Sequence, residues 1–177
     1  GNIHFTVATG GKIKSSPAVL TTTTGTEIVF GSDDEKIYAI DDKGNSLNGW
    51  PIELSGSLSG SPVIADLDGD GEAEIIAVTD KSMVYAINSD GTFMEFFPIT
   101  ANFPFNGAPA ISDLDNDGDL EIIAASGGDL TVIDIKSQGS VAGYWNQFQG
   151  GYERRGSTPL GGCTNSDYCN YNADAQW

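Results

Sequence analysis

Residues 60–74 read Gly-Ser-Pro-Val-Ile-Ala-Asp-Leu-Asp-Gly-Asp-Gly-Glu-Ala-Glu, a short apolar run followed at once by an acidic, glycine-rich loop. Residues 107–121 repeat this order as Gly-Ala-Pro-Ala-Ile-Ser-Asp-Leu-Asp-Asn-Asp-Gly-Asp-Leu-Glu, with Pro109 standing 47 positions after Pro62. A weaker copy begins at residues 16–20, Ser-Pro-Ala-Val-Leu. Self-similarity at a fixed period is the sequence signature of a repeat architecture, so the chain is organised as three successive units.

The parts of each unit that follow the loop also correspond. The matching apolar segments are residues 27–30, 74–77 and 121–124, and then residues 38–40, 85–87 and 131–133. These segments are three to six residues long, rich in β-branched residues and separated by Gly, Asp and Asn clusters, which indicates strands. No segment has apolar residues at helical spacing over ten residues, so we expect almost no helix.

Four short strands in a unit of this length are typical of one β-propeller blade. We therefore predict an all-β fold of about three four-stranded, blade-like units that form a partial propeller or an open array. A β-sandwich of three successive sheets is the alternative. Propellers close with about four to eight blades, so further blades of a longer chain, blades from other chains, or open stacking remain as alternatives.

The repeat divides the chain into five parts. They are an N-terminal strand of a further blade (1–11), repeat 1 (12–59), repeat 2 (60–106), repeat 3 with a closing strand (107–157), and a cysteine-containing tail (158–177).

The acidic loops of repeats 2 and 3 are the candidate metal sites. Both carry carboxylates at loop positions 1, 3, 5 and 9 and glycine at position 6. Calcium accepts six to eight oxygen ligands in a flexible geometry, whereas an all-protein cage suits magnesium poorly. We predict two calcium ions, with side-chain ligands at positions 1, 3, 5 and 9 and the backbone carbonyl of position 7. The predicted ligands are Asp66, Asp68, Asp70, Glu72 and Glu74 in repeat 2, and Asp113, Asp115, Asp117, Asp119 and Glu121 in repeat 3.

The acidic loops have two other interpretations. An EF-hand is disfavoured because Ala77 and Ala124 stand where that loop needs a glutamate, and strand-like segments follow instead of a helix. A pair of solvated acidic turns that bind nothing is the remaining alternative. Repeat 1 has only residues 21–26, Thr-Thr-Thr-Thr-Gly-Thr, at this place, so we expect no metal there.

The overall charge argues against some partners. The 177 residues include 8 basic and 25 acidic side chains, which gives a net charge of −17. Nucleic acids and anionic membrane surfaces are bound through clustered Lys and Arg, so we expect neither as a partner. No apolar run approaches the roughly 20 residues of a membrane-spanning helix, so we expect no membrane insertion.

The repeated acidic loops make the chain resemble a known family. The pattern Asp-x-Asp-x-Asp-Gly-x-x-Glu between two apolar strands, repeated every 45 to 50 residues, is similar to the FG-GAP or VCBS repeats of integrin-α-type propellers and many secreted bacterial proteins. The resemblance covers roughly residues 12–157 and implies calcium at both loops. Residues 145–156 also resemble the segment at the terminus of such propellers, which implies that further blades precede residue 1.

The tail resembles a second kind of sequence. Residues 162–175 are similar to the Gly-Cys-Thr…Cys-Asn-Tyr modules of secreted bacterial proteins. The resemblance favours a disulfide between Cys163 and Cys169, with free thiols as the alternative. A disulfide implies an oxidising, extracellular setting, where weak calcium sites are common.

The sequence carries none of the common catalytic motifs. Its single histidine, His4, stands near one end, and there is no Gly-x-Ser-x-Gly elbow, phosphate-binding loop or His-Glu-x-x-His pair. We therefore expect a non-catalytic module rather than an enzyme. Trp50, Tyr85 and Trp145 are expected in the core, with stacking on sugar rings as the alternative.

These observations predict a calcium-binding extracellular module for adhesion, matrix assembly or protein interaction. The expected partners are other blades, copies of the same chain, or an extracellular protein or glycan. The alternatives are a lectin-like carbohydrate-binding module and an accessory domain of a larger secreted hydrolase or lyase.

Overall fold

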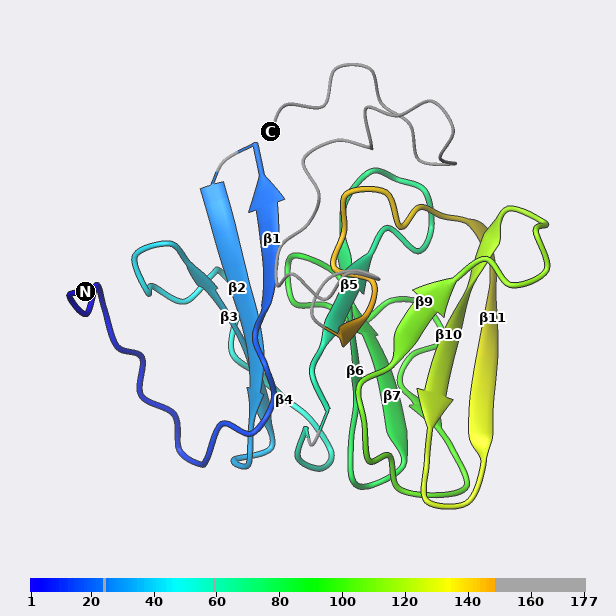
Figure 1. Cartoon of the computed structure of the whole chain (residues 1–177), viewed down its shortest axis with the longest axis horizontal. Coiled ribbons are helices and arrows are strands. Elements are labelled where there is room, and N and C mark those ends of the chain that lie inside the picture. Colours follow the sequence, from blue (N-terminus) through cyan, green and yellow to red (C-terminus); the bar gives the residue numbers. More distant parts are fainter. Residues whose placement is uncertain (24, 59, 149–177) are drawn as a thin grey trace.

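Eleven strands form three antiparallel sheets in the part of the chain that the structure describes, residues 1–23, 25–58 and 60–148. The structure is a computed structural model. Sheet 1 contains β1 (Ala18–Thr22), β2 (Gly25–Ser32), β3 (Lys36–Asp41) and β4 (Ile52–Glu53); sheet 2 contains β5 (Val63–Ala65), β6 (Glu74–Val78), β7 (Met83–Ile87) and β8 (Ile99–Thr100); sheet 3 contains β9 (Ala110–Ser112), β10 (Asp119–Ala125) and β11 (Leu130–Gln138). Within each sheet, each strand pairs with the next strand in the chain (Figure 1).

The all-β prediction is confirmed. The described residues contain no α-helix, and the three sheets fall in the three repeats. No helix in these ranges has the length and apolar character that crossing a membrane requires. The predicted disulfide of Cys163 and Cys169 lies outside the described residues.

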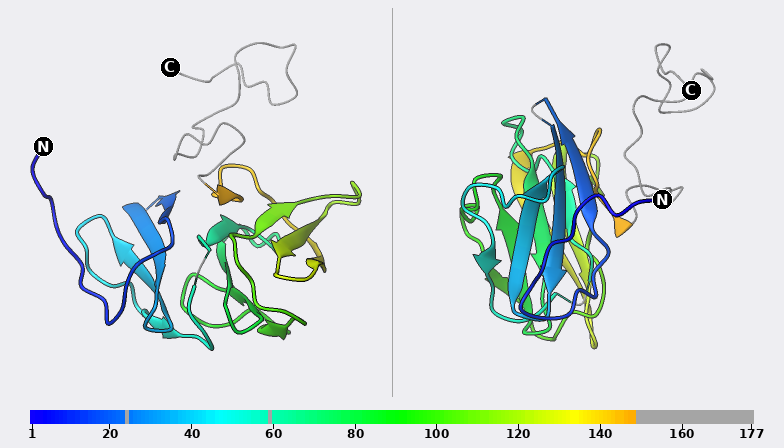
Figure 2. Two further views of the ribbon diagram at one scale, coloured as in Figure 1. Left: turned by 60° about the horizontal axis from the view of Figure 1, so that its bottom comes forward. Right: turned by 90° about the vertical axis from the view of Figure 1, so that its left-hand side faces the viewer.

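The sheets stand side by side and pack face to face (Figures 1 and 2), with β1, β5 and β9 next to one another. One apolar cluster fills the space between sheets 1 and 2, and a second fills the space between sheets 2 and 3. Trp50, Tyr85 and Trp145 are all buried, so their predicted place in the core is confirmed. Burial of the apolar side chains in these two clusters is the main source of the free energy that holds the three sheets together.

Each sheet has two distinct faces. We call the face turned toward the next sheet the trailing face, and the face turned toward the previous sheet the leading face. The trailing-face positions are Ala18, Leu20, Val29, Ile37 and Ala39 in sheet 1; Val63, Ala65, Ile76, Val84 and Ala86 in sheet 2; and Ala110, Ser112, Ile123, Leu130 and Val132 in sheet 3.

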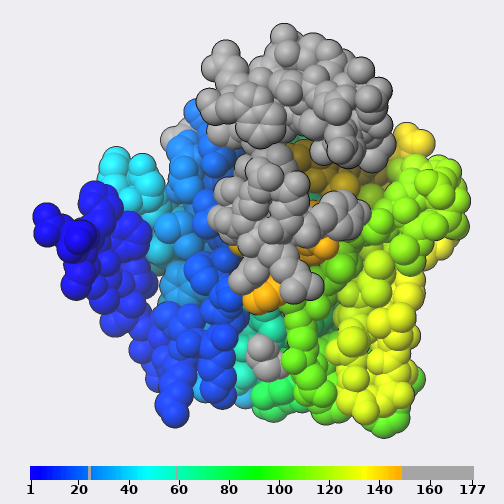
Figure 3. All heavy atoms as spheres, viewed as in Figure 1, coloured from blue at the N-terminus to red at the C-terminus, as the bar shows by residue number. Residues whose placement is uncertain are grey.

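Sheet 3 differs from the prediction of four strands per unit, because its described part has three. In repeats 1 and 2 the chain reverses after the third strand at Gly44 and Gly91, whose φ angles are +86° and +89°. Ser137 stands at the corresponding position of repeat 3, and β11 runs straight on to Gln138. A left-handed turn residue is strained for side chains other than glycine, which accounts for the missing reversal. β11 therefore forms the flank of the molecule at the right of Figure 3.

After β11 the chain returns to the free edges of the inner strands. We call residues 139–146 the crossing segment. Its Ser140 exchanges two backbone hydrogen bonds with Asp66, of 2.7 and 3.1 Å, and the carbonyl of Trp145 accepts the N–H of Ile64 at 2.8 Å. The carbonyl of Asn146 accepts the N–H of Ile111 at 3.0 Å, so the segment ties sheets 2 and 3 together.

Residues 1–11 form no strand, which differs from our expectation. This stretch is extended, and its Phe5 and Val7 pack against Phe30, Tyr38 and Ile40 on the leading face of sheet 1. The rings of Phe30 and Tyr38 stack with centroids 5.3 Å apart. The stretch covers this face through side chains rather than through backbone pairing.

Candidate metal centres

The two acidic loops connect equivalent strands. Residues 66–74, the repeat-2 loop, join β5 to β6, and residues 113–121, the repeat-3 loop, join β9 to β10. In both hairpins the first loop residue follows an inner strand and the last loop residue pairs back at the start of the next strand. The two loops therefore lie at the same end of neighbouring sheets.

The aspartate at position 1 organises each loop through backbone N–H groups. One carboxylate oxygen of Asp66 accepts the N–H of Gly69 at 2.7 Å, and the other accepts the N–H of Gly71 at 3.2 Å. Asp113 makes the same two bonds, of 2.7 and 3.2 Å, to the N–H groups of Asn116 and Gly118. Hydrogen bonds to carboxylates are stronger than those between neutral groups, so each aspartate fixes its turn before any ion arrives.

The glutamate at position 9 closes the loop from the other side. Glu74 accepts the N–H of Leu67 at 2.7 Å, and Glu121 accepts the N–H of Leu114 at 2.6 Å. Both glutamates are buried, with exposed fractions of 2% and 5%. Each glutamate therefore has a framework role as well as its predicted role as a ligand.

The sharp turns depend on left-handed backbone at two positions. Gly69 and Asn116 at position 4 have φ angles of +76° and +62°, and Gly71 and Gly118 at position 6 have +88° and +97°. Glycine and, less readily, asparagine adopt this conformation. At Gly69 a Cβ atom would also collide with the backbone carbonyl of Gln138, so the repeat-2 loop and the end of β11 pack closely.

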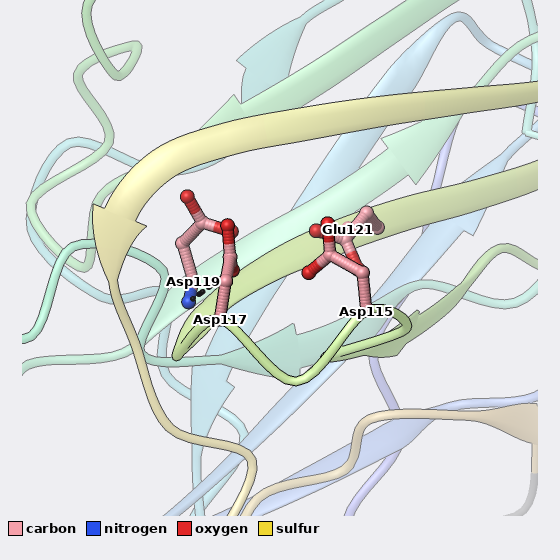
Figure 4. Close-up of side chains that lie close together, drawn as sticks. All are labelled: Asp115, Asp117, Asp119 and Glu121. Carbon is pink, nitrogen blue, oxygen red and sulfur yellow. Dashed lines mark hydrogen bonds between the residues drawn. The ribbon is translucent and has the colours of Figure 1, made fainter.

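The remaining carboxylates gather in both loops. Ligand atoms of Asp115, Asp117, Asp119 and Glu121 all lie within 4.8 Å of one another, and those of Asp66, Asp68 and Asp70 do so in the repeat-2 loop. Figure 4 shows Asp115 close to Glu121, with Asp117 beside Asp119. Each group is compact enough to hold one metal ion.

The predicted ligands are thus brought together with some differences between the loops. Glu74 and Asp113 hold the loop frameworks and stand outside these two compact groups. Glu72 is exposed and belongs to neither group. Asp119, which we expected to contribute its backbone carbonyl, brings its carboxylate into the repeat-3 group. Its Oδ1 atom is buried without a hydrogen-bond partner among the described residues, as a carboxylate oxygen left for a cation would be.

Two neighbours of the loops were not predicted from the sequence. The ammonium of Lys136 on β11 forms an ion pair with Asp134 and lies 3.8 Å from Asp119 in the repeat-3 loop. Tyr144 of the crossing segment lies near the repeat-2 loop, and burial together with Asp66 and Glu74 raises the pKa of its hydroxyl. No sequence motif predicts either contact. The only related signal is Ser137, which replaces the turn glycine of the other repeats and marks where β11 departs from the repeat.

The electrostatics of both loops favour a cation. Burial raises the pKa of Glu74 to about 7, and the carboxylates of Asp68, Asp70 and Asp66 add to the shift. The adjoining carboxyl group of Asp117 raises the pKa of Asp119 to about 6. Crowded carboxylates destabilise one another's charged forms, and a bound cation removes that penalty.

The donor set fits a hard cation. All available ligand atoms are oxygens from carboxylates, with backbone carbonyls between them, which is the set that calcium takes in proteins. In the repeat-1 turn the described residues include no such group, in line with the absence of acids from residues 21–26.

Comparison with known proteins agrees with the fold and with the loops. Residues 66–124 match the family profile described as FG-GAP-like repeat, and this range contains both loops. No curated protein matches the chain in sequence.

Two of the solved structures that the chain matches are the following. BamB from Moraxella catarrhalis is 21% identical with a TM-score of 0.45, over 72% of this chain and 35% of that chain. The V. cholerae biofilm matrix protein Bap1 is 20% identical with a TM-score of 0.52, over 71% of this chain and 24% of that chain. This chain therefore corresponds to only about a third and a quarter of these two proteins. The profile match supports the FG-GAP family for the part of the chain that carries the two acidic loops.

Proposed function

We propose that the chain is a non-catalytic, calcium-binding interaction module that works outside the cell. The observation that carries the proposal is the common framework of the two loops. In both, a position-1 aspartate and a position-9 glutamate hold the backbone through bonds of the same pattern, while further carboxylates converge. This shared construction supports a common ion-binding role for the two loops.

Calcium would be held by carboxylates of Asp66, Asp68 and Asp70 in repeat 2 and of Asp115, Asp117, Asp119 and Glu121 in repeat 3, with Glu74 and Asp113 completing the two sets. Bound calcium supplies positive charge that offsets carboxylate repulsion. The residues of the chain supply the preformed turns, and the two loops then stabilise the same end of sheets 2 and 3. Because the unfolded chain lacks these sites, binding free energy adds to folding stability.

The proposed setting is extracellular. Calcium modules outside cells bind with Kd values of about 0.1–1 mM, which suits partly exposed loops such as these. The fold also occurs in a protein described as a biofilm matrix protein, which is a setting of the same kind. The proposal assigns no reaction to the chain, because the clustered acids are all used as loop framework or ligands.

Calcium titration by calorimetry tests the proposal directly. We expect two ions per chain. Asp68→Asn with Asp70→Asn should remove one, and Asp115→Asn with Asp117→Asn should remove the other. Asp42→Asn, an exposed acid outside both loops, is the matched control and should leave two. Binding of no calcium, or loss of both ions from either pair of substitutions with the fold intact, would contradict the assignment.

A further inference from the structure

The trailing face of sheet 3 is apolar although no described sheet covers it. At corresponding positions of β3 and β7, Ile37 and Val84 are both 0% exposed, whereas Leu130 on β11 is 65% exposed. At the next position of this face, Ala86 is 0% exposed and Val132 is 47% exposed. The repeat thus keeps apolar residues at positions that are buried only where another sheet follows.

The rest of this face has the same character. Ile123 on β10 lies between Ala110 on β9 and Val132 on β11, and Ala125 lies opposite Leu130. Asp134 and Lys136 continue along β11 and provide a polar end to the face. A contiguous apolar area with a polar border is typical of an interaction surface rather than of a solvated sheet.

The two interfaces inside the chain define what fits this face. In both, a trailing face meets a leading face, and the leading faces of sheets 2 and 3 share isoleucines at corresponding positions, Ile75 and Ile122. The chain has one further leading face, on sheet 1, where Ile28 occupies that position. It is covered by Phe5 and Val7 from a stretch that forms no strand.

We propose that the trailing face of sheet 3 docks the leading face of sheet 1 of a second copy of this chain, head to tail. The incoming sheet takes the place of the side chains of Phe5 and Val7. Head-to-tail contacts close into a ring when the rotation between copies permits it. Two copies bring six sheets together, which lies within the usual range of closed propellers.

The charge of the chain sets the conditions for association. Two copies at −17 each repel, and salt or bound calcium weakens this repulsion. The proposal rests on the interaction role given above but not on calcium, so the experiment is run in EDTA at high salt as well as in calcium. Association in EDTA at high salt would support the docking even if calcium binding failed.

Sedimentation velocity over a range of concentrations is the test, with three variants. The tail variant carries Leu130→Asp and Val132→Asp, and the head variant carries Ile28→Asp. Phe96→Asp is the matched control, because Phe96 is 84% exposed and lies in the connection between β7 and β8, outside the strands that form the two faces. Circular dichroism confirms that each variant is folded.

We expect the wild type and the control to dimerise. The head variant and the tail variant should each remain monomeric when alone. Their mixture should dimerise, because one intact leading face of sheet 1 then meets one intact trailing face of sheet 3. A monomeric wild type at high concentration would overturn the proposal and leave the face to a sheet elsewhere in a longer polypeptide. Dimers of the head variant alone would also overturn it, since they would show that two trailing faces meet.

Discussion

Asp66→Ala will destabilise the chain even when calcium is absent, whereas Asp68→Ala will not. Asp66 is 6% exposed and accepts two backbone N–H groups of the repeat-2 loop, so its removal leaves both donors without their partner. A hydrogen bond to a charged group contributes about 1.5–3 kcal/mol. Water can replace part of each bond because Gly69 and Gly71 are exposed, so we expect a loss of about 2–4 kcal/mol for the two bonds together. Asp68 is exposed, and its removal also relieves carboxylate repulsion.

Urea denaturation in EDTA and in calcium measures this difference. In EDTA, only Asp66→Ala should lower the free energy of unfolding. In calcium, both variants should lose the stabilisation that the repeat-2 ion adds. Asp66→Asn keeps one carbonyl oxygen as an acceptor and should fall between the wild type and alanine. Equal stability of the two alanine variants in EDTA would show that the position-1 aspartate is only a ligand and not part of the loop framework.

In the metal-free chain, the stability contributed by Glu74 will fall as the pH rises from about 4.5 to 7. The folded-state pKa of Glu74 is raised to about 7 from an ordinary value of 4.5, so the folded chain holds a proton that the unfolded chain releases earlier. Stability then decreases with pH across this window, by about 2–3 kcal/mol in total. Glu74 faces Asp66, Asp68 and Asp70, and Tyr144 lies near it.

The pH dependence of unfolding in EDTA, compared between the wild type and Glu74→Gln, isolates this contribution from that of the other acids. The wild type should lose more stability than the variant between pH 4.5 and 7. Glu53→Gln, at a side chain that is 84% exposed, is the control and should follow the wild type. Calcium needs the ionised glutamate, so in calcium the loss should shrink or reverse as the pH rises. Parallel curves for the wild type and Glu74→Gln would contradict the buried, protonated glutamate.

The spacing of the repeat predicts the three sheets and the positions of both loops, although sheet 3 has three strands in its described part rather than four. Apolar segments of three to six residues at a period of 45 to 47 predict short antiparallel strands, because each must bury one face against the next unit. The glycine at position 6 and the acids around it predict the loops because few other residues tolerate that turn.

Other features depend on tertiary contacts that a linear pattern does not contain. Residues 139–146 run along the free edges of β5 and β9 because the backbone N–H groups there need hydrogen-bond acceptors. No local sequence motif predicts this path. The framework role of Asp66 and Glu74 could not be predicted from the sequence either. Their residue type is equally suited to binding a cation and to accepting N–H groups, and only the fold distinguishes the two.

A thermal melt in calcium, in EDTA and in magnesium tests the central claim most directly. At a calcium concentration of about 100 times Kd, each site contributes about 2.7 kcal/mol. For a chain of this size, two such sites raise the melting temperature by roughly 10–20 °C. We predict that rise in calcium, with little change in magnesium. The same melting temperature in all three conditions would contradict a structural role for calcium and would make the two loops acidic turns without a bound ion.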